Sequence, residues 1–169
     1  MKLTEFFLAE LEREAASTRS ALARVPEGNN DWKPHPKSMA LGYLASLVAT
    51  MPAWIASMVG LDEFDMKSPE AEKFKPLEWR TRKELIGALD QAVDEARAAL
   101  QATSDEHLLR PWRFLVDGHV LSENPRHSMI SEEVFSHLAH HRGQLTVYLR
   151  LNESTVPAGY GTSDGGHFE

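Results

Sequence analysis

The residues with the clearest chemical potential lie near the C-terminus, in residues 136–145 (SHLAHHRGQL). Two histidines, His137 and His141, stand four residues apart in a segment with helical apolar periodicity. On a helix this spacing places both imidazoles on one face, one turn apart, close enough to share a metal ion. Zinc and nickel accept imidazole readily, whereas calcium and magnesium prefer oxygen. The pair therefore predicts a zinc or nickel site with His137 and His141 as ligands.

Two ligands do not complete a site of this kind. A catalytic zinc site usually takes three protein ligands and leaves one position for water or substrate, so a third ligand is expected from another element. His140 lies about 100° around the helix from His141 and is predicted to face away from the pair. The remaining histidines stand in loop or turn contexts, where a surface position is the simpler interpretation: His35, His107, His119, His127 and His167.

Other residues have simpler interpretations. Arg142 and Gln144, beside the pair, are predicted to orient groups around the metal ligands or to join helix–helix contacts. The four tryptophans are predicted to anchor the core and loops and not to form a ligand-binding cluster: Trp32, Trp54, Trp79 and Trp112. The sequence has no Gly-rich phosphate loop, no G-x-S-x-G motif and no paired-carboxylate motif. The histidine pair is therefore the feature that we single out for chemistry.

Composition sets the broad class. A chain of 169 residues can bury one core, which predicts a single domain over residues 1–169. A net charge of −7 without any Lys/Arg-rich run argues against a nucleic-acid partner. The absence of cysteine excludes disulfides, thiolate metal sites and a cysteine nucleophile. With no signal-peptide pattern and no apolar run of transmembrane length, we expect a cytoplasmic protein with no membrane partner.

Apolar periodicity predicts four long helices, over residues 4–23, 38–58, 81–103 and 128–151. Ser38 is the expected N-cap of the second helix. Pro52 is expected to kink that helix, because proline removes a backbone donor and crowds the preceding turn. The third helix has the clearest start signal, since Thr81 and Glu84 fit a capping box.

The connections complete the prediction of the fold. Residues 62–79 are polar and contain prolines, which indicates a loop with at most a short turn of helix. Residues 112–121 predict a small β-hairpin that turns at Asp117-Gly118. Four helices of this length indicate an all-α fold, a four-helix bundle with the hairpin between its third and fourth helices. Two connections exceed what an up-down bundle needs, so a crossover is expected.

The chain resembles the DinB-like family, damage-inducible proteins related to thiol-dependent transferases and isomerases. The resemblance covers nearly the whole chain, and its motifs are residues 32–39 (WKPHPKSM), 41–44 (LGYL), 51–54 (MPAW), 137–145 (HLAHHRGQL), 147–152 (VYLRLN) and 156–161 (VPAGYG). It implies a DinB/YfiT-like four-helix bundle with a crossover connection, usually a homodimer. It also implies a divalent-metal site made of three histidines.

The resemblance places two of these ligands on His137 and His141. The third belongs to the pattern Leu-Gly-x-Leu-x-x-His on the second helix, but residues 41–47 read LGYLASL, so Leu47 stands where the histidine is expected. Leucine cannot bind a metal, and it introduces an apolar side chain in the position of a ligand. We therefore expect zinc or nickel at low occupancy or absent.

Three functional interpretations follow. The first is a DinB-like protein with a degenerate metal site, a weak or vestigial binder of metal or of a small molecule. The alternative is an active metal-dependent hydrolase or thiol S-transferase, in which His35, His119 or a carboxylate replaces the missing ligand. Its metal would lower the pKa of a bound water or low-molecular-weight thiol. The third interpretation is a purely structural dimer. The charge balance gives no support to a role on DNA.

Overall fold

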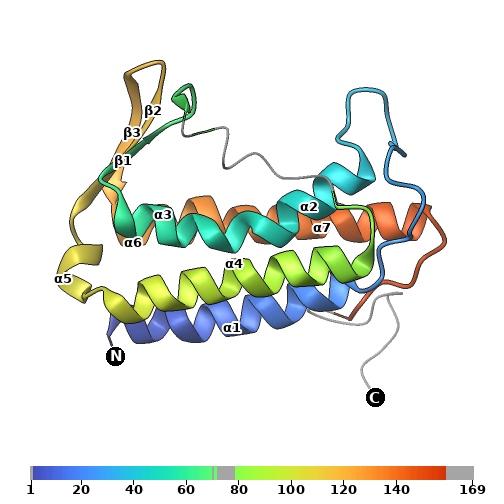
Figure 1. The fold of residues 1–169 in the computed structure, drawn as a ribbon, viewed down its shortest axis with the longest axis horizontal. Helices are drawn as coiled ribbons and strands as arrows, with labels where there is room; N and C mark the ends of the chain where they lie inside the picture. The colour runs from blue at the N-terminus through green and yellow to red at the C-terminus, as the bar shows by residue number, and fades with distance from the viewer. Residues whose placement is uncertain (1, 70, 72–78, 159–169) are drawn as a thin grey trace.

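A computed structural model describes residues 2–69, 71 and 79–158, and within them the chain is mostly helical with one small sheet (Figure 1). Four long helical segments carry most of the chain: α1 (Leu3–Leu22), α2 to α3 (Leu41–Thr50 and Trp54–Gly60, joined by η1, Met51–Ala53), α4 (Arg82–Ala102), and α6 to α7 (Arg126–Met129 and His137–Leu151, joined by η3, Ile130–Ser136). These segments confirm the predicted helices, with shifts of a few residues at their ends.

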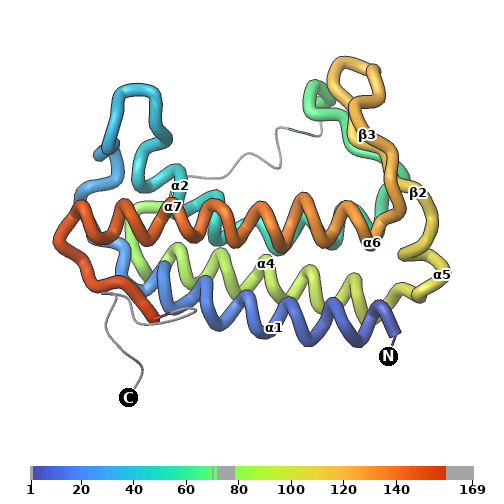
Figure 2. Tube along the Cα trace, turned by 180° about the vertical axis from the view of Figure 1, so that it is seen from behind, coloured from blue at the N-terminus to red at the C-terminus, as the bar shows by residue number. Residues whose placement is uncertain are grey.

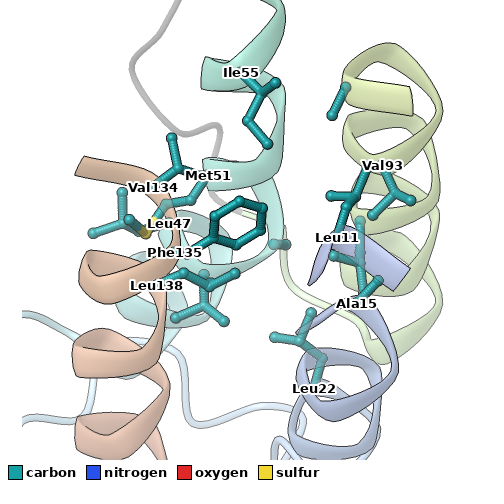
Figure 3. Packing of buried hydrophobic residues seen from close by; sticks show 14 of the residues in the cluster. Leu11, Ala15, Leu22, Leu47, Met51, Ile55, Val93, Val134, Phe135 and Leu138 are labelled. Carbon is teal, nitrogen blue, oxygen red and sulfur yellow. The ribbon is translucent and has the colours of Figure 1, made fainter. Parts of the chain in front are cut away.

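The four segments lie side by side and share one core. Contacts join α1 to α4, α2 and α3 to α4, and α2 to α7, and Figure 2 shows the same neighbours from behind. Figure 3 shows side chains from all four segments meeting in the interior, among them Leu11, Met51, Val93 and Leu138. The segment from α2 to α3 and the next long helix, α4, run in the same direction (Figure 1).

The predicted N-terminal cap is present in one helix and absent in another. The capping box of α4 is present as predicted, because the Thr81 side chain accepts from the Glu84 N–H and the Glu84 carboxylate accepts from the Thr81 N–H. The prediction that Ser38 caps the second helix is wrong. That helix begins at Leu41, and its N-cap is Ala40, which makes no side-chain hydrogen bond.

Pro52 interrupts the second long segment as expected. It lies in η1, a 3₁₀ turn between α2 and α3, which accommodates the missing backbone donor. By length and composition Leu41–Gly60 could cross a membrane, so the prediction that no apolar run reaches this length is wrong. However, 61% of its most apolar window is buried inside the fold, and its contacts with α4 and α7 make it a core segment.

The predicted hairpin is part of a larger sheet. Strands β2 (Pro111–Val116) and β3 (His119–Pro125) pair antiparallel and turn at Asp117-Gly118, as predicted. A third strand, β1 (Glu63–Asp65), pairs parallel with β2 inside the segment predicted to be a loop. The short helix α5 (Asp105–Leu108) was also not predicted. Most of the remaining predicted loop, residues 70 and 72–78, lies outside the described residues.

The Asp65 carboxylate fixes β1 against the hairpin turn. It accepts hydrogen bonds from the backbone N–H groups of Lys67 (2.8 Å), Asp117 (3.0 Å) and Gly118 (2.7 Å). These hydrogen bonds lower the pKa of Asp65, and those from Lys67 and Gly118 have the largest effects. The turn that follows β1 is therefore held next to the tip of the hairpin.

A buried guanidinium joins the end of α3, the start of β2 and the start of α6. Arg126 is only 1% exposed. It donates to the carbonyl oxygens of Met58 (3.0 Å), Pro111 (2.8 Å) and Leu61 (3.1 Å), and it pairs with Asp62. Because a charged donor binds carbonyls strongly and all three carbonyls are at least partly buried, this contact fixes three elements relative to one another.

We predict that Arg126→Met lowers the free energy of unfolding by about 2–4 kcal/mol, because it leaves these carbonyls without a donor. Urea denaturation measures the change. The matched control is Arg113→Met, which removes an ion pair with Glu63 whose side chains are 46% and 47% exposed and should cost less than about 1 kcal/mol. Equal losses in the two variants would contradict the role of Arg126.

Candidate functional site: an apolar pocket beside a histidine pair

A pocket with a volume of about 320 Å³ lies among α2 to α3, the sheet, and the junction of η3 with α7. Its lining is mainly apolar and includes the aromatic side chains Tyr43, Trp54, Phe64, Trp112 and Phe114. Three other lining residues are polar or charged: Ser57, Glu133 and His137. A concave apolar site with few polar groups is typical of small-molecule binding.

The structure brings the predicted histidine pair together at one edge of this site. The ring centroids of His137 and His141 lie 4.5 Å apart, with 40° between the ring planes. His137 lines the pocket, where its ring also packs 5.9 Å from that of Trp54. His140 is exposed, but its ring contacts His141 at 5.1 Å, so the prediction that it faces away from the pair is only partly right.

His141 is held as a buried imidazole. It is 9% exposed, and its Nδ1 lies 2.8 Å from Oε1 of Gln144, so Nδ1 donates and Nε2 is the unprotonated nitrogen of the neutral ring. Burial lowers the pKa of His141, and His137 and His140 lower it further, against a smaller raising effect of the Gln144 contact. Gln144 thus contacts one member of the pair, His141, and no hydrogen bond joins it to His137 among the described residues.

Arg142 joins helices, as predicted. Its Nη1 donates to Oε2 of Glu14 (2.5 Å) and to the Thr18 hydroxyl (3.1 Å), and Glu14 is 2% exposed. Glu14 also pairs with Arg13 at 2.8 Å. This buried ion pair holds the helix that carries the histidines against α1.

Leu47 stands where the resemblance expects the third metal ligand. Leu47, 8% exposed, lines the same pocket as His137, so an apolar side chain occupies the side of the site where the resemblance predicts an imidazole. In the described ranges, no three His, Asp or Glu side chains form a group that could hold a metal. His35 and His119, the proposed substitutes, are exposed and not grouped with the pair. The described donors do not fit a three-ligand metal centre.

Two buried polar atoms in the site lack partners. His137 Nδ1 and Trp112 Nε1 are the buried side-chain nitrogens with no hydrogen-bond partner in the part of the chain that the structure describes. Both residues line the pocket. Because buried polar groups are nearly always paired, two unpaired nitrogens at one pocket distinguish it from ordinary core.

Sequence reasoning missed two features of the site. Trp54 and Trp112 pack in or against the core as expected, but they also line the pocket, which the sequence prediction did not include. The seven residues of η3, directly before His137, form a π-helix, a rare conformation that often occurs at functional sites. No residue pattern marks this π-helix, since Val134 and Leu138 keep ordinary helical spacing. The sequence identifies the tryptophans as large aromatic residues, but it does not show that Trp54 and Trp112 line one pocket.

The fold and site thus define a mostly helical protein with a small sheet and an apolar pocket beside two histidines. A profile of the DinB family matches residues 1–165, and the chain belongs to the DinB family. This confirms the resemblance found in the sequence.

Solved structures agree with this assignment. A DinB-like protein from Bacillus cereus is 25% identical, with a TM-score of 0.70 over 92% of this chain and 97% of that chain. A DinB-like protein from Bacillus subtilis shares the fold at 18% identity, with a TM-score of 0.66 over 92% of this chain and 98% of that chain. No curated protein matches the chain.

The lowered pKa of His141 predicts a pH dependence of stability. Below its ordinary pKa of about 6.5, the unfolded chain binds a proton that the folded imidazole resists, so stability falls as the pH drops from 7 to 5. We expect His141→Gln to reduce this fall in Tm, measured with chelator present. The exposed control His35→Gln should not change it. The same fall in wild type and His141→Gln would contradict the assignment.

Proposed function

We propose that this DinB-family protein binds a small, largely apolar molecule in the pocket between Trp54 and Trp112. We propose further that His137 and His141 are the remnant of a metal site and bind zinc or nickel only weakly. The observation that carries this proposal is the position of Leu47, which lines the same pocket as His137. An apolar side chain there favours an apolar ligand over a hydrated metal ion.

The size and lining of the pocket support a small-molecule ligand. A volume of about 320 Å³ falls within the range of ligand-binding clefts. Burying apolar surface supplies most of the driving force for binding in such a site, and its few polar groups orient the ligand. Ser57, Glu133 and His137 are the residues that we assign to that orienting role.

The donor chemistry supports weak metal binding. Gln144 orients His141 with Nε2 unprotonated, which suits a metal ligand. Two imidazoles without a third protein donor are one ligand short of a catalytic zinc site. The alternative, an active hydrolase or thiol S-transferase, requires a substitute donor, and none of the described residues supplies one.

The remaining expectations from the resemblance belong to the same proposal. We infer a four-helix bundle with a crossover, which is supported by α3 and α4 running in the same direction (Figure 1). We also propose a homodimer in the cytoplasm. Neither a nucleic acid nor a membrane is proposed as a partner.

We expect the pocket to bind the neutral apolar fluorophore N-phenyl-1-naphthylamine in a saturable manner, with an increase in its emission. Ser57→Phe should weaken binding at least about tenfold, because the added ring occupies space that the ligand needs. Ser131→Phe is the matched control, since Ser131 is exposed and does not line the pocket. Equal binding by the two variants would place the ligand elsewhere.

Leu47→His should rebuild the metal site. In the tag-free variant, we expect zinc at about 100 times the variant's Kd for zinc to raise the Tm by about 5–10 °C. The reason is that zinc would bind the native state selectively. The wild type should shift by less than about 2 °C at that zinc concentration. Adding His137→Gln and His141→Gln to the variant should abolish the shift. A large zinc-dependent shift in the wild type would contradict the proposed weak site.

A further inference from the structure

We infer that the ligand of this pocket is a hydrophobic organic cation, an amine or quaternary ammonium attached to an apolar group. This inference rests on the proposed function, since it names the class of small molecule that the same pocket selects. It depends on two properties of the lining: the aromatic side chains and the sign of the charge.

Aromatic rings make up much of the lining. Tyr43, Trp54, Phe64, Trp112 and Phe114 contribute from α2, α3, β1 and β2. The rings of Trp112 and Phe114 stack at 6.4 Å with 22° between their planes. The faces of aromatic rings carry partial negative charge and attract ammonium groups, and tryptophan does so most strongly. Aromatic residues from separate elements therefore line one pocket, and an aromatic lining favours an organic cation.

The charge of the pocket lining also favours a cation. Glu133 lines it, whereas no Lys or Arg does among the described residues. The guanidinium of Arg126, which fixes the end of α3 next to β2, already binds three carbonyls and Asp62. The chain carries a net charge of −7, which adds long-range attraction for a cation.

Other ligand classes fit less well. An anion would meet Glu133 and find no lysine or arginine to pair with. A sugar or another polyhydroxylated ligand would bury many hydroxyl groups against a lining that offers few hydrogen-bond partners, at a cost for each unpaired group. A neutral hydrocarbon fits the rings, but it gains nothing from Glu133.

Three probes with one phenylbutyl group isolate the effect of charge: 4-phenylbutylammonium, 4-phenylbutanol and 4-phenylbutanoate. Isothermal titration calorimetry at low salt gives their Kd values for the full-length protein. We expect the cation to bind at least about threefold more tightly than the alcohol, the lower range of a cation–π contribution. The carboxylate should bind more weakly than the alcohol.

Glu133→Gln should reduce affinity for the ammonium probe about three- to tenfold and leave affinity for the alcohol unchanged. Glu132→Gln is the matched control, because Glu132 is exposed on the same helical segment and does not line the pocket. If the alcohol binds as tightly as the cation, or if Glu133→Gln changes nothing, the inference is overturned while the proposed function stands. If neither these probes nor the naphthylamine binds, the proposed function fails as well.

Discussion

The guanidinium of Arg126, buried at the start of α6, fixes the three elements that surround the pocket. One wall belongs to α2 and α3, a second to the sheet, and the third to the junction of η3 with α7. Arg126 binds carbonyl groups at the end of α3 and at the start of β2, and it begins the helix that carries the histidines. A buried charge without partners would strongly destabilise the folded protein. The walls that carry the partners of Arg126 are therefore held close to their positions. Asp65 adds a second tie at the hairpin turn.

Within this frame, one residue determines the character of the site. The family resemblance places a histidine at position 47, and we propose that such a residue would complete a metal site with the histidine pair. Leu47 instead continues the apolar lining toward His137. The pair that remains is compatible with burial, because the lowered pKa of His141 keeps that ring neutral near pH 7. The site has the properties of an apolar pocket with one polar edge, which is the basis of the proposed function.

Features encoded within a few residues were predictable from the sequence. The capping box at Thr81 and Glu84 fixed the start of α4, and Pro52 produced the expected interruption. The hairpin turns where Asp117 and Gly118 both adopt positive φ, at 52° and 75°, a conformation that suits an Asp-Gly pair. The i, i+4 spacing of the histidines likewise placed their rings together.

Features that depend on distant contacts were not predictable. Strand β1 has three residues and pairs with β2 about fifty positions later, so no local alternation marks it. No local pattern marks Arg126 as buried, because its partners come from α3 and β2. The π-helix before His137 and the placement of Trp54 and Trp112 at one pocket also depend on packing among several elements. Thus the sequence predicted that the two histidine rings lie together, while the pocket beside them depends on the whole fold.

The central claim is that an apolar pocket has taken the place of a complete metal site. The most direct measurement is a crystal structure of the tag-free protein soaked with zinc and 4-phenylbutylammonium, with anomalous data collected at the zinc edge. We predict density for the organic cation between Trp54 and Trp112, and a weak or absent zinc peak at His137 and His141. A fully occupied zinc held by both histidines and a third protein ligand, with no organic molecule in the pocket, would contradict it.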